Sequence, residues 1–169
     1  KGDRYDWDAD NALIWSQYLT LLDNCQAKVN TYNASYTDIK FGVAIPWWYD
    51  TDNYDTRGPS DIQTRVNYVT IMDYRDSGPN IVSGARTEIE NGDTLGKKVF
   101  VGVETAQAVP PDPPTITFYE EGNDAMEETL AYAASVFNAN ASFGGFAIHY
   151  YEDISAGEVA YRGLWTTSF

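Results

Sequence analysis

Four short apolar runs, each ending in acidic and aromatic residues, constrain the fold of this chain most strongly. They are rich in Val, Ile and Phe, and they cover residues 41–50, 68–76, 97–105 and 145–153. Continuous apolar runs of this length are typical of strands that are buried on both faces, as in a parallel sheet. In parallel α/β proteins the functional groups lie beyond the carboxyl ends of the strands. The pattern therefore predicts a parallel sheet whose polar strand ends share one rim.

The segments between these runs have the residue spacing of helices. Their apolar residues recur at intervals of three and four positions, which places them on one helical face. Residues 109–114 (VPPDPP) predict a stiff polyproline-like loop. Helices are predicted over residues 6–30, 61–66, 81–90, 122–137 and 154–164, the third of them closed by Asn91-Gly92 and Gly96. One helix followed by four β/α units predicts a single α/β domain over residues 1–169 with right-handed crossovers.

Four β/α units are half of a TIM (β/α)8 barrel, which typically takes ~250 residues. Four strands in barrel curvature leave two open edges, which are prone to aggregation. The chain could be the C-terminal half of a larger barrel, it could pair with a second chain, or it could form a small open sheet with covered edges. We expect one of the first two, so that a missing N-terminal half or a second chain completes the barrel.

The charge of the chain excludes some classes of partner. With 25 acidic and 11 basic residues, its formal net charge is −14. Nucleic acids and anionic membranes both require a basic surface, so neither is an expected partner. No apolar run approaches the ~20 residues of a membrane helix, so we expect no membrane insertion. The charge suits neutral or cationic partners, or bound divalent cations.

Cysteine usage and glycosylation motifs bear on the compartment. The single cysteine, Cys25, lies on the apolar side of the first predicted helix, and we expect a buried free thiol. Asn33 and Asn140 each begin an N-x-S triplet, the acceptor motif for N-glycosylation. Together with few Lys and many Tyr, Asn and Thr, these motifs favour an extracellular or cell-surface protein.

The strand ends resemble a known superfamily. IPWWYD, VTIMDYRD, VFVGVET, ITFYEEG and FAIHYYE are similar to strands five to eight of glycosidase-type (β/α)8 barrels, closest to uncharacterised bacterial proteins of that superfamily. The resemblance covers residues 6–153, and it implies a domain that acts on a glycan by carboxylate acid/base chemistry. This chain would begin beyond the acidic motif that those families carry at the end of strand four. Residues 71–74 (IMDY) also resemble strand six of chitinase-like family 18 enzymes, although Arg75 stands where their final aspartate would be.

Glycoside hydrolysis needs two carboxyl groups, about 5 to 9.5 Å apart, on either side of the scissile bond. The catalytic candidates at the predicted strand ends are Glu104, Asp73 and Asp50, with Asp76 as a further carboxylate. Glu104 is the strongest, because it follows an apolar strand. It also holds the strand-seven position where, by resemblance, retaining glycosidases of the clan around family 5 place their nucleophile. The alternative is a structural Glu104 that pairs with Arg75 or a tyrosine.

The predicted substrate-binding residues surround these carboxylates. They are Trp47, Trp48, Tyr74, Arg75, His149, Tyr151 and Glu152. Aromatic rings stack on the flat faces of sugars, and two adjacent Trp of a strand point to opposite sides, so one should pack and one should face the ligand. If Phe146 and Ile148 face the helices, then His149 and Tyr151 face the barrel axis. The alternative for a lone histidine in a strand is a core residue. No Ser/Cys–His–Asp motif accompanies it, so acyl transfer is not expected.

Cofactor chemistry has little support in the sequence. One His and one Cys do not make a zinc site, and no nucleotide-binding motif is present. Asp50, Asp52 and Asp55 form an oxygen-rich loop that could hold Ca²⁺, although most such loops are simply solvated. We therefore expect no cofactor. Two functions remain open: a glycoside hydrolase, and a non-catalytic glycan-binding or structural component of a surface assembly.

Overall fold

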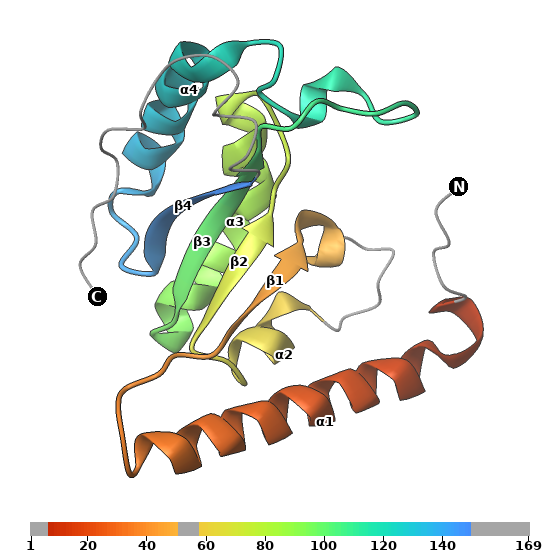
Figure 1. Cartoon of the computed structure of the whole chain (residues 1–169), viewed down its shortest axis with the longest axis vertical. Helices are drawn as coiled ribbons and strands as arrows, with labels where there is room; N and C mark the ends of the chain where they lie inside the picture. The colour runs from red at the N-terminus through yellow and green to blue at the C-terminus, as the bar shows by residue number, and fades with distance from the viewer. Residues whose placement is uncertain (1–6, 51–57, 150–169) are drawn as a thin grey trace.

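The fold is a single sheet of four parallel strands that alternate with helices (Figure 1). The computed structural model describes residues 7–50 and 58–149, without the side chains of residues 7–12 and residue 50. The strands are β1 (Gly42–Pro46), β2 (Tyr68–Met72), β3 (Lys98–Glu104) and β4 (Phe143–His149), and their order in the sheet is β1-β2-β3-β4. All three neighbouring pairs are parallel. The predicted parallel α/β architecture is confirmed.

The helices follow the predicted order. They are α1 (Trp7–Asn33), the 3-10 helix η1 (Trp47–Asp50), α2 (Pro59–Gln63), α3 (Gly78–Leu95), the 3-10 helix η3 (Pro114–Ile116) and α4 (Gly122–Phe137). The bounds of α4 are those predicted. The helix predicted over residues 154–164 lies outside the described residues.

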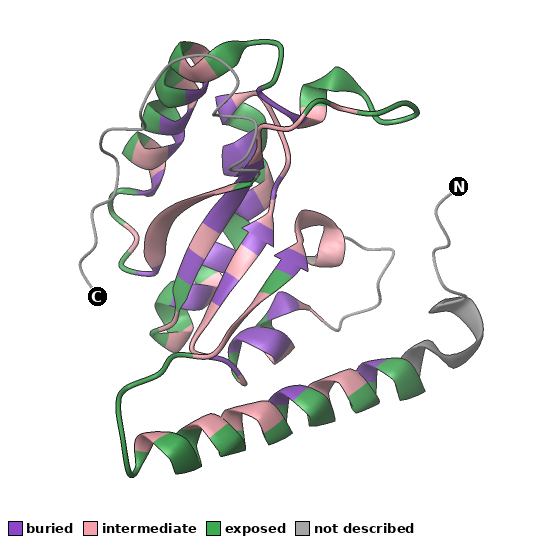
Figure 2. Cartoon of the chain, in the orientation of Figure 1, coloured by how far each residue is buried: buried purple, intermediate pink, exposed green. Residues whose placement is uncertain are grey.

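Only one face of the sheet is covered by helices in the described part of the chain. Val69, Ile71, Val99, Val101 and Val103 are fully buried, and they share one core with apolar residues of α3 and α4. On the opposite face Ala44 is exposed, while its neighbours in the register, Thr70 and Phe100, are half-buried. Burial therefore alternates along β2 (Figure 2). The prediction of strands buried on both faces is wrong for these residues, because one layer of helices covers one face.

Several predicted strand ends are shorter or shaped differently. β1 ends at Pro46, whose ring removes a backbone donor, and residues 47–50 turn into η1 instead of continuing the strand. β4 begins at Phe143, with a register irregularity opposite Val99 and Phe100. Gly145 lies there with φ 106°, a conformation that favours glycine.

Two predictions about local structure need correction. Residues 109–114 do not form a stiff extended loop, because the Asp112 amide turns back to donate to the Val109 carbonyl at 3.0 Å and η3 begins at Pro114. Cys25 is a free thiol, as predicted, but it is half-buried and not buried, because α1 lies at the edge of the core.

Gly92 does not end its helix, contrary to the sequence prediction, since α3 continues through Leu95 to a left-handed cap at Gly96. Gly92 is instead a point at which α3 approaches the sheet closely. A Cβ atom built there would lie 2.8 Å from Ser142 Cβ, 2.8 Å from Val99 Cγ2 and 2.9 Å from the Lys97 carbonyl oxygen. The absence of a side chain is therefore what lets the end of α3 pack on β3.

Replacing Gly92 by Ala tests this packing. Ala normally stabilises a helix interior by about 1 kcal/mol relative to Gly, whereas here we expect a net loss of about 1–3 kcal/mol in the free energy of unfolding because the new methyl group overpacks the contact. Urea denaturation measures the change. Ser83→Ala, at an exposed position of the same helix, is the control and should change stability by less than about 0.5 kcal/mol. A stabilised Gly92→Ala variant would contradict the close approach.

Candidate functional site

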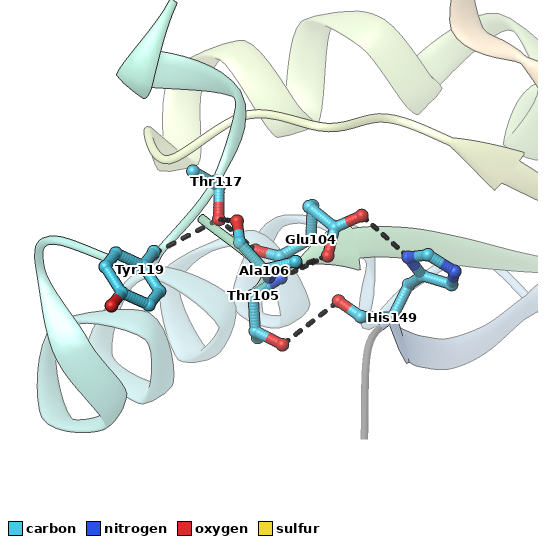
Figure 3. A network of polar contacts seen from close by, with 6 residues as sticks. All are labelled: Glu104, Thr105, Ala106, Thr117, Tyr119 and His149. Carbon is cyan, nitrogen blue, oxygen red and sulfur yellow. Dashed lines mark hydrogen bonds and ion pairs between the residues drawn. The ribbon is translucent and has the colours of Figure 1, made fainter. Parts of the chain in front are cut away.

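The register between β3 and β4 brings Glu104 and His149 opposite each other at the carboxyl ends of their strands. The His149 Nδ1 atom lies 2.6 Å from Glu104 Oε2 (Figure 3). Their backbones are joined as well, because the Thr105 amide and the Thr105 hydroxyl both donate to the His149 carbonyl, at 2.6 and 3.2 Å. The two side chains form a pair held by the sheet itself.

The Glu104 carboxylate is fixed on both of its oxygens. Oε1 accepts hydrogen bonds from the backbone amides of Thr105 and Ala106, both at 2.8 Å, while Oε2 contacts the imidazole. The Glu104 side chain is 13% exposed and that of His149 is 59% exposed. A neutral imidazole that donates from Nδ1 has its lone pair on Nε2. The pair thus combines an oriented, largely covered carboxylate with an accessible imidazole ring.

A segment before α4 supports the turn that follows Glu104. The buried Thr117 hydroxyl donates to the Ala106 carbonyl at 2.7 Å and lies 3.2 Å from the Glu104 carbonyl. The Tyr119 amide donates to the same hydroxyl at 3.2 Å (Figure 3). The Phe118 amide donates to the Glu104 carbonyl at 3.0 Å. These bonds fix the backbone whose amides hold the carboxylate. The stretch 116–122 (ITFYEEG), which resembles a strand end in sequence, thus does not form a strand. It runs from the end of η3 to the start of α4 and is hydrogen-bonded to the carboxyl end of β3.

Tyr74 follows β2 and packs against the His149 ring of the pair. Its ring is stacked on the His149 ring, with 6.0 Å between the centroids and 19° between the planes. Burial raises the pKa of Tyr74 above its ordinary value of 10.0, and the negative charge of Glu104 raises it further. The phenol therefore stays neutral at physiological pH and presents a flat ring beside the imidazole.

Trp47 and Arg75 extend the rim toward β1. The Arg75 guanidinium carbon lies 4.3 Å from the centroid of the Trp47 ring, and Arg75 Nη1 donates to the Tyr74 carbonyl at 2.8 Å. Trp47 packs against the core, and Trp48 contacts Tyr49 edge-on with 5.0 Å between the centroids. Because residues 47–50 form a 3-10 helix, the strand alternation predicted for the two Trp does not apply.

Asp73 is not brought together with Glu104. It is buried, and a Cβ atom built at Gly84 of α3 would lie 2.5 Å from Asp73 Oδ1. Asp73 therefore faces the helix layer, in phase with Ile71, whereas Glu104 faces the uncovered side together with His149. Two carboxyls that act on one glycosidic bond must face the same substrate, so this geometry does not support Asp73 as the partner of Glu104.

Several predicted site residues lie outside the described part of the chain. They are the Asp50 side chain, Tyr151, Glu152 and the calcium candidates Asp52 and Asp55. Within residues 13–49 and 58–149, no group of three or more His, Cys, Asp or Glu side chains could hold a metal ion. In the same part of the chain, no helix has the length and apolarity needed to cross a membrane.

Both triplet asparagines make structural hydrogen bonds. Asn33 brackets the turn before β1, because its amide nitrogen donates to the Ile39 carbonyl at 2.8 Å and its oxygen accepts from the Ile39 amide at 2.9 Å. The side-chain amide nitrogen of Asn140 donates to Asp93 Oδ2 at 2.6 Å. Ser142, the third residue of the second triplet, is buried and donates from its hydroxyl to the Ile89 carbonyl at 2.6 Å. Glycosylation of these asparagines stays a prediction.

Comparisons of the chain with protein-family models, with curated proteins and with solved structures find no match.

Glu104→Gln should lower the pKa of Tyr74, because it removes the nearby negative charge that disfavours the phenolate. The pKa of Tyr74 should stay above 10.0, since burial is the larger cause of the shift. An NMR titration of labelled tyrosine rings measures the change. Glu90→Gln, an exposed change on α3, is the control and should leave the pKa of Tyr74 where it is. An equal pKa of Tyr74 in the Glu104 variant and the original protein would contradict the described site.

A second prediction concerns Asp93, which ties the end of α3 to the turn before β4. Its pKa lies below the ordinary value of 3.8, first because the Asn140 side chain donates to it and then because the Ser142 amide does, at 2.7 Å. Because its pKa is lowered in the folded protein, the Asp93 carboxylate stabilises the fold at pH values above its ordinary pKa of 3.8. This contribution is lost as the pH falls through the pKa of Asp93 in the folded protein.

Asp93→Ala should therefore lower the urea midpoint at about pH 7, and the difference from the original protein should shrink below about pH 4. The exposed Asp112→Ala change is the control and should leave the midpoint unaltered at both pH values. If the Asp93 difference were the same at acid and neutral pH, the two charge-assisted bonds would not be what stabilises this turn.

Proposed function

We propose that this chain is half of a glycosidase-type (β/α)8 barrel in which Glu104 acts on a glycan. The strand order supports the barrel. Doubly wound sheets reverse their strand order at a switch point, whereas the β/α barrel keeps sequential order throughout. Here the order is β1-β2-β3-β4, with helices over one face only in the described part of the chain.

Closure of such a barrel needs further strands. Within the described residues β1 pairs only with β2, and β4 pairs only with β3. In a closed barrel each edge strand gains a second neighbour, and the half-buried face that carries Thr70 and Phe100 becomes the inside of the barrel. The additional strands would come from a missing N-terminal half or from a second chain.

The pairing of Glu104 with His149 is the single observation that carries the proposal for catalysis. Its position suits a barrel enzyme, because catalytic residues of these folds lie at the carboxyl ends of the strands. Two backbone amides and the imidazole hold the carboxylate. A fixed carboxylate is what nucleophilic attack on the anomeric carbon, or proton transfer to the glycosidic oxygen or from a water molecule, requires. Glu104 would be the catalytic carboxylate and His149 the residue that positions it.

The second carboxyl group would come from the strands that complete the barrel, because Asp73 faces the helices. The same observation favours the second candidate function, a non-catalytic domain that binds glycans at this rim. The two triplet motifs, together with few Lys and many Tyr, Asn and Thr, support a protein that works outside the cell or at its surface under either function.

Glu104→Gln separates the two functions. Measured on the native assembly against a panel of glycans, this change should reduce turnover by about 10³-fold or more, because it removes the reacting carboxylate. The amide oxygen can still accept from Thr105 and Ala106, so the free energy of unfolding should change by less than about 1 kcal/mol. The control Glu90→Gln should keep full turnover. Unchanged turnover in the Glu104 variant removes Glu104 as the catalytic residue, and glycan binding without turnover supports the second function.

A further inference from the structure

We propose that Arg75, held on the ring of Trp47, binds the anionic group of an acidic sugar within the glycan. This inference rests on the proposed function, because it names the class of substrate for the same rim. The guanidinium carbon lies 4.3 Å from the Trp47 centroid, and Nη1 donates to the Tyr74 carbonyl. The cation–π contact and this hydrogen bond hold the guanidinium group in place, so it loses less conformational freedom on binding an anion.

Arg75 differs from the other described arginines. Arg65 pairs with Asp23 at 3.3 Å and Arg86 lies 3.7 Å from Glu90, whereas no carboxylate of residues 13–49 and 58–149 lies within 4.0 Å of the Arg75 guanidinium. Carboxylates are abundant in this chain, which has 25 acidic residues and 11 basic ones. The lack of a carboxylate partner for Arg75 among the described residues is therefore not due to a shortage of acidic side chains. A guanidinium has five N–H donors, and in the described structure Arg75 makes a single hydrogen bond, to a carbonyl.

The location of Arg75 relative to Glu104 suits a bound glycan. Trp47 follows β1, Arg75 and Tyr74 follow β2, and Glu104 ends β3. Neighbouring strands lie about 4.8 Å apart, so the strands that carry Trp47 and Arg75 lie about 5–10 Å from β3, which carries Glu104. Tyr74 connects them, because its carbonyl accepts from Arg75 and its ring stacks on His149. A glycan of a few sugars that reaches Glu104 can place one ring beside Trp47 and its acidic group on Arg75.

The net charge of −14 limits how many charges the glycan can carry. Repulsion from distant carboxylates is screened over a Debye length of about 8 Å at physiological ionic strength. A bidentate, charge-assisted bond between Arg75 and one carboxylate or sulfate acts at contact and is little screened. One anionic sugar in an otherwise neutral glycan is therefore favoured, whereas repulsion grows with every further charge of a polyanion.

Binding measurements on the native assembly test this inference. The probes are a trisaccharide that ends in glucuronate, its methyl ester, the matching trisaccharide that ends in glucose, and the same neutral trisaccharide carrying a sulfate ester. The glucuronate should bind at least about tenfold more tightly than its methyl ester, a difference of about 1.4 kcal/mol. Equal preference for the sulfate identifies a site for anionic sugars in general, and preference for the carboxylate alone identifies a uronate site.

Variants of Arg75 assign the preference to this residue. Arg75→Gln should remove the preference for the acid over the ester, so that both bind with the same affinity to this variant. Arg75→Lys keeps the charge but loses the planar donor fork, so it should retain only part of the preference. Arg86→Gln, which removes an exposed arginine of α3, is the control and should keep the whole preference.

The outcomes distinguish this inference from the proposed function. Equal binding of acid and ester, or a preference that survives in Arg75→Gln, overturns the anionic subsite and leaves the glycan site standing. Failure of all four probes, together with the absence of turnover across the glycan panel, overturns the proposed function and the subsite with it.

Discussion

The hydrogen-bond register between β3 and β4 determines which side chains meet at the rim of the sheet. It pairs Gly102 with Ala147 and Glu104 with His149, while Val103 and Ile148 face the helices. A slip of one residue would turn His149 toward the helix layer and separate it from the carboxylate, because side chains alternate along a strand. The irregularity near Gly145 lies at the other end of β4, so the rim itself is regular. The pairing of the two strand backbones thus determines the geometry of the site. The hydrogen bonds of the Thr117 hydroxyl to the Ala106 and Glu104 carbonyls stabilise it further.

The uncovered face of the sheet connects this rim to the question of a barrel. Tyr68 and Phe100 pack edge-on there with 5.6 Å between their ring centroids, and Gly42 lies directly under the Tyr68 ring. At Gly102 a side chain would press on the Ile71 carbonyl, with a Cβ 2.9 Å away. Large rings at one level and glycine or alanine at another give this face layers of different size. Layers of side chains also fill the interior of a β/α barrel, so the half-buried rings are compatible with the proposed barrel.

Much of this arrangement could be read from the sequence, and the failures have physical causes. The apolar runs located all four strands, and alternation correctly placed His149 on the face opposite Phe146 and Ile148. The same alternation, counted from Val69 and Ile71, would have placed Asp73 among the helices, and Gly84 was the signal that α3 makes room for it. The bend at Pro46 that folds Trp47 into a 3-10 helix is a weaker signal. The Thr117 hydroxyl bonds to backbone carbonyls more than ten positions away in the sequence, so no local sequence pattern could reveal these contacts.

The proposed glycan site lies at the rim where Glu104 and His149 meet. His149 is the single histidine of this chain, and a His149→Gln variant identifies the signal of its ring Hε1 proton in the NMR spectrum of the native assembly. Adding a panel of oligosaccharides to the native assembly and following this signal is the most direct measurement. We predict a saturable shift of the His149 signal with at least one oligosaccharide of the panel. A His149 signal that stays fixed while a glycan is shown to bind elsewhere on the protein would contradict the proposed site.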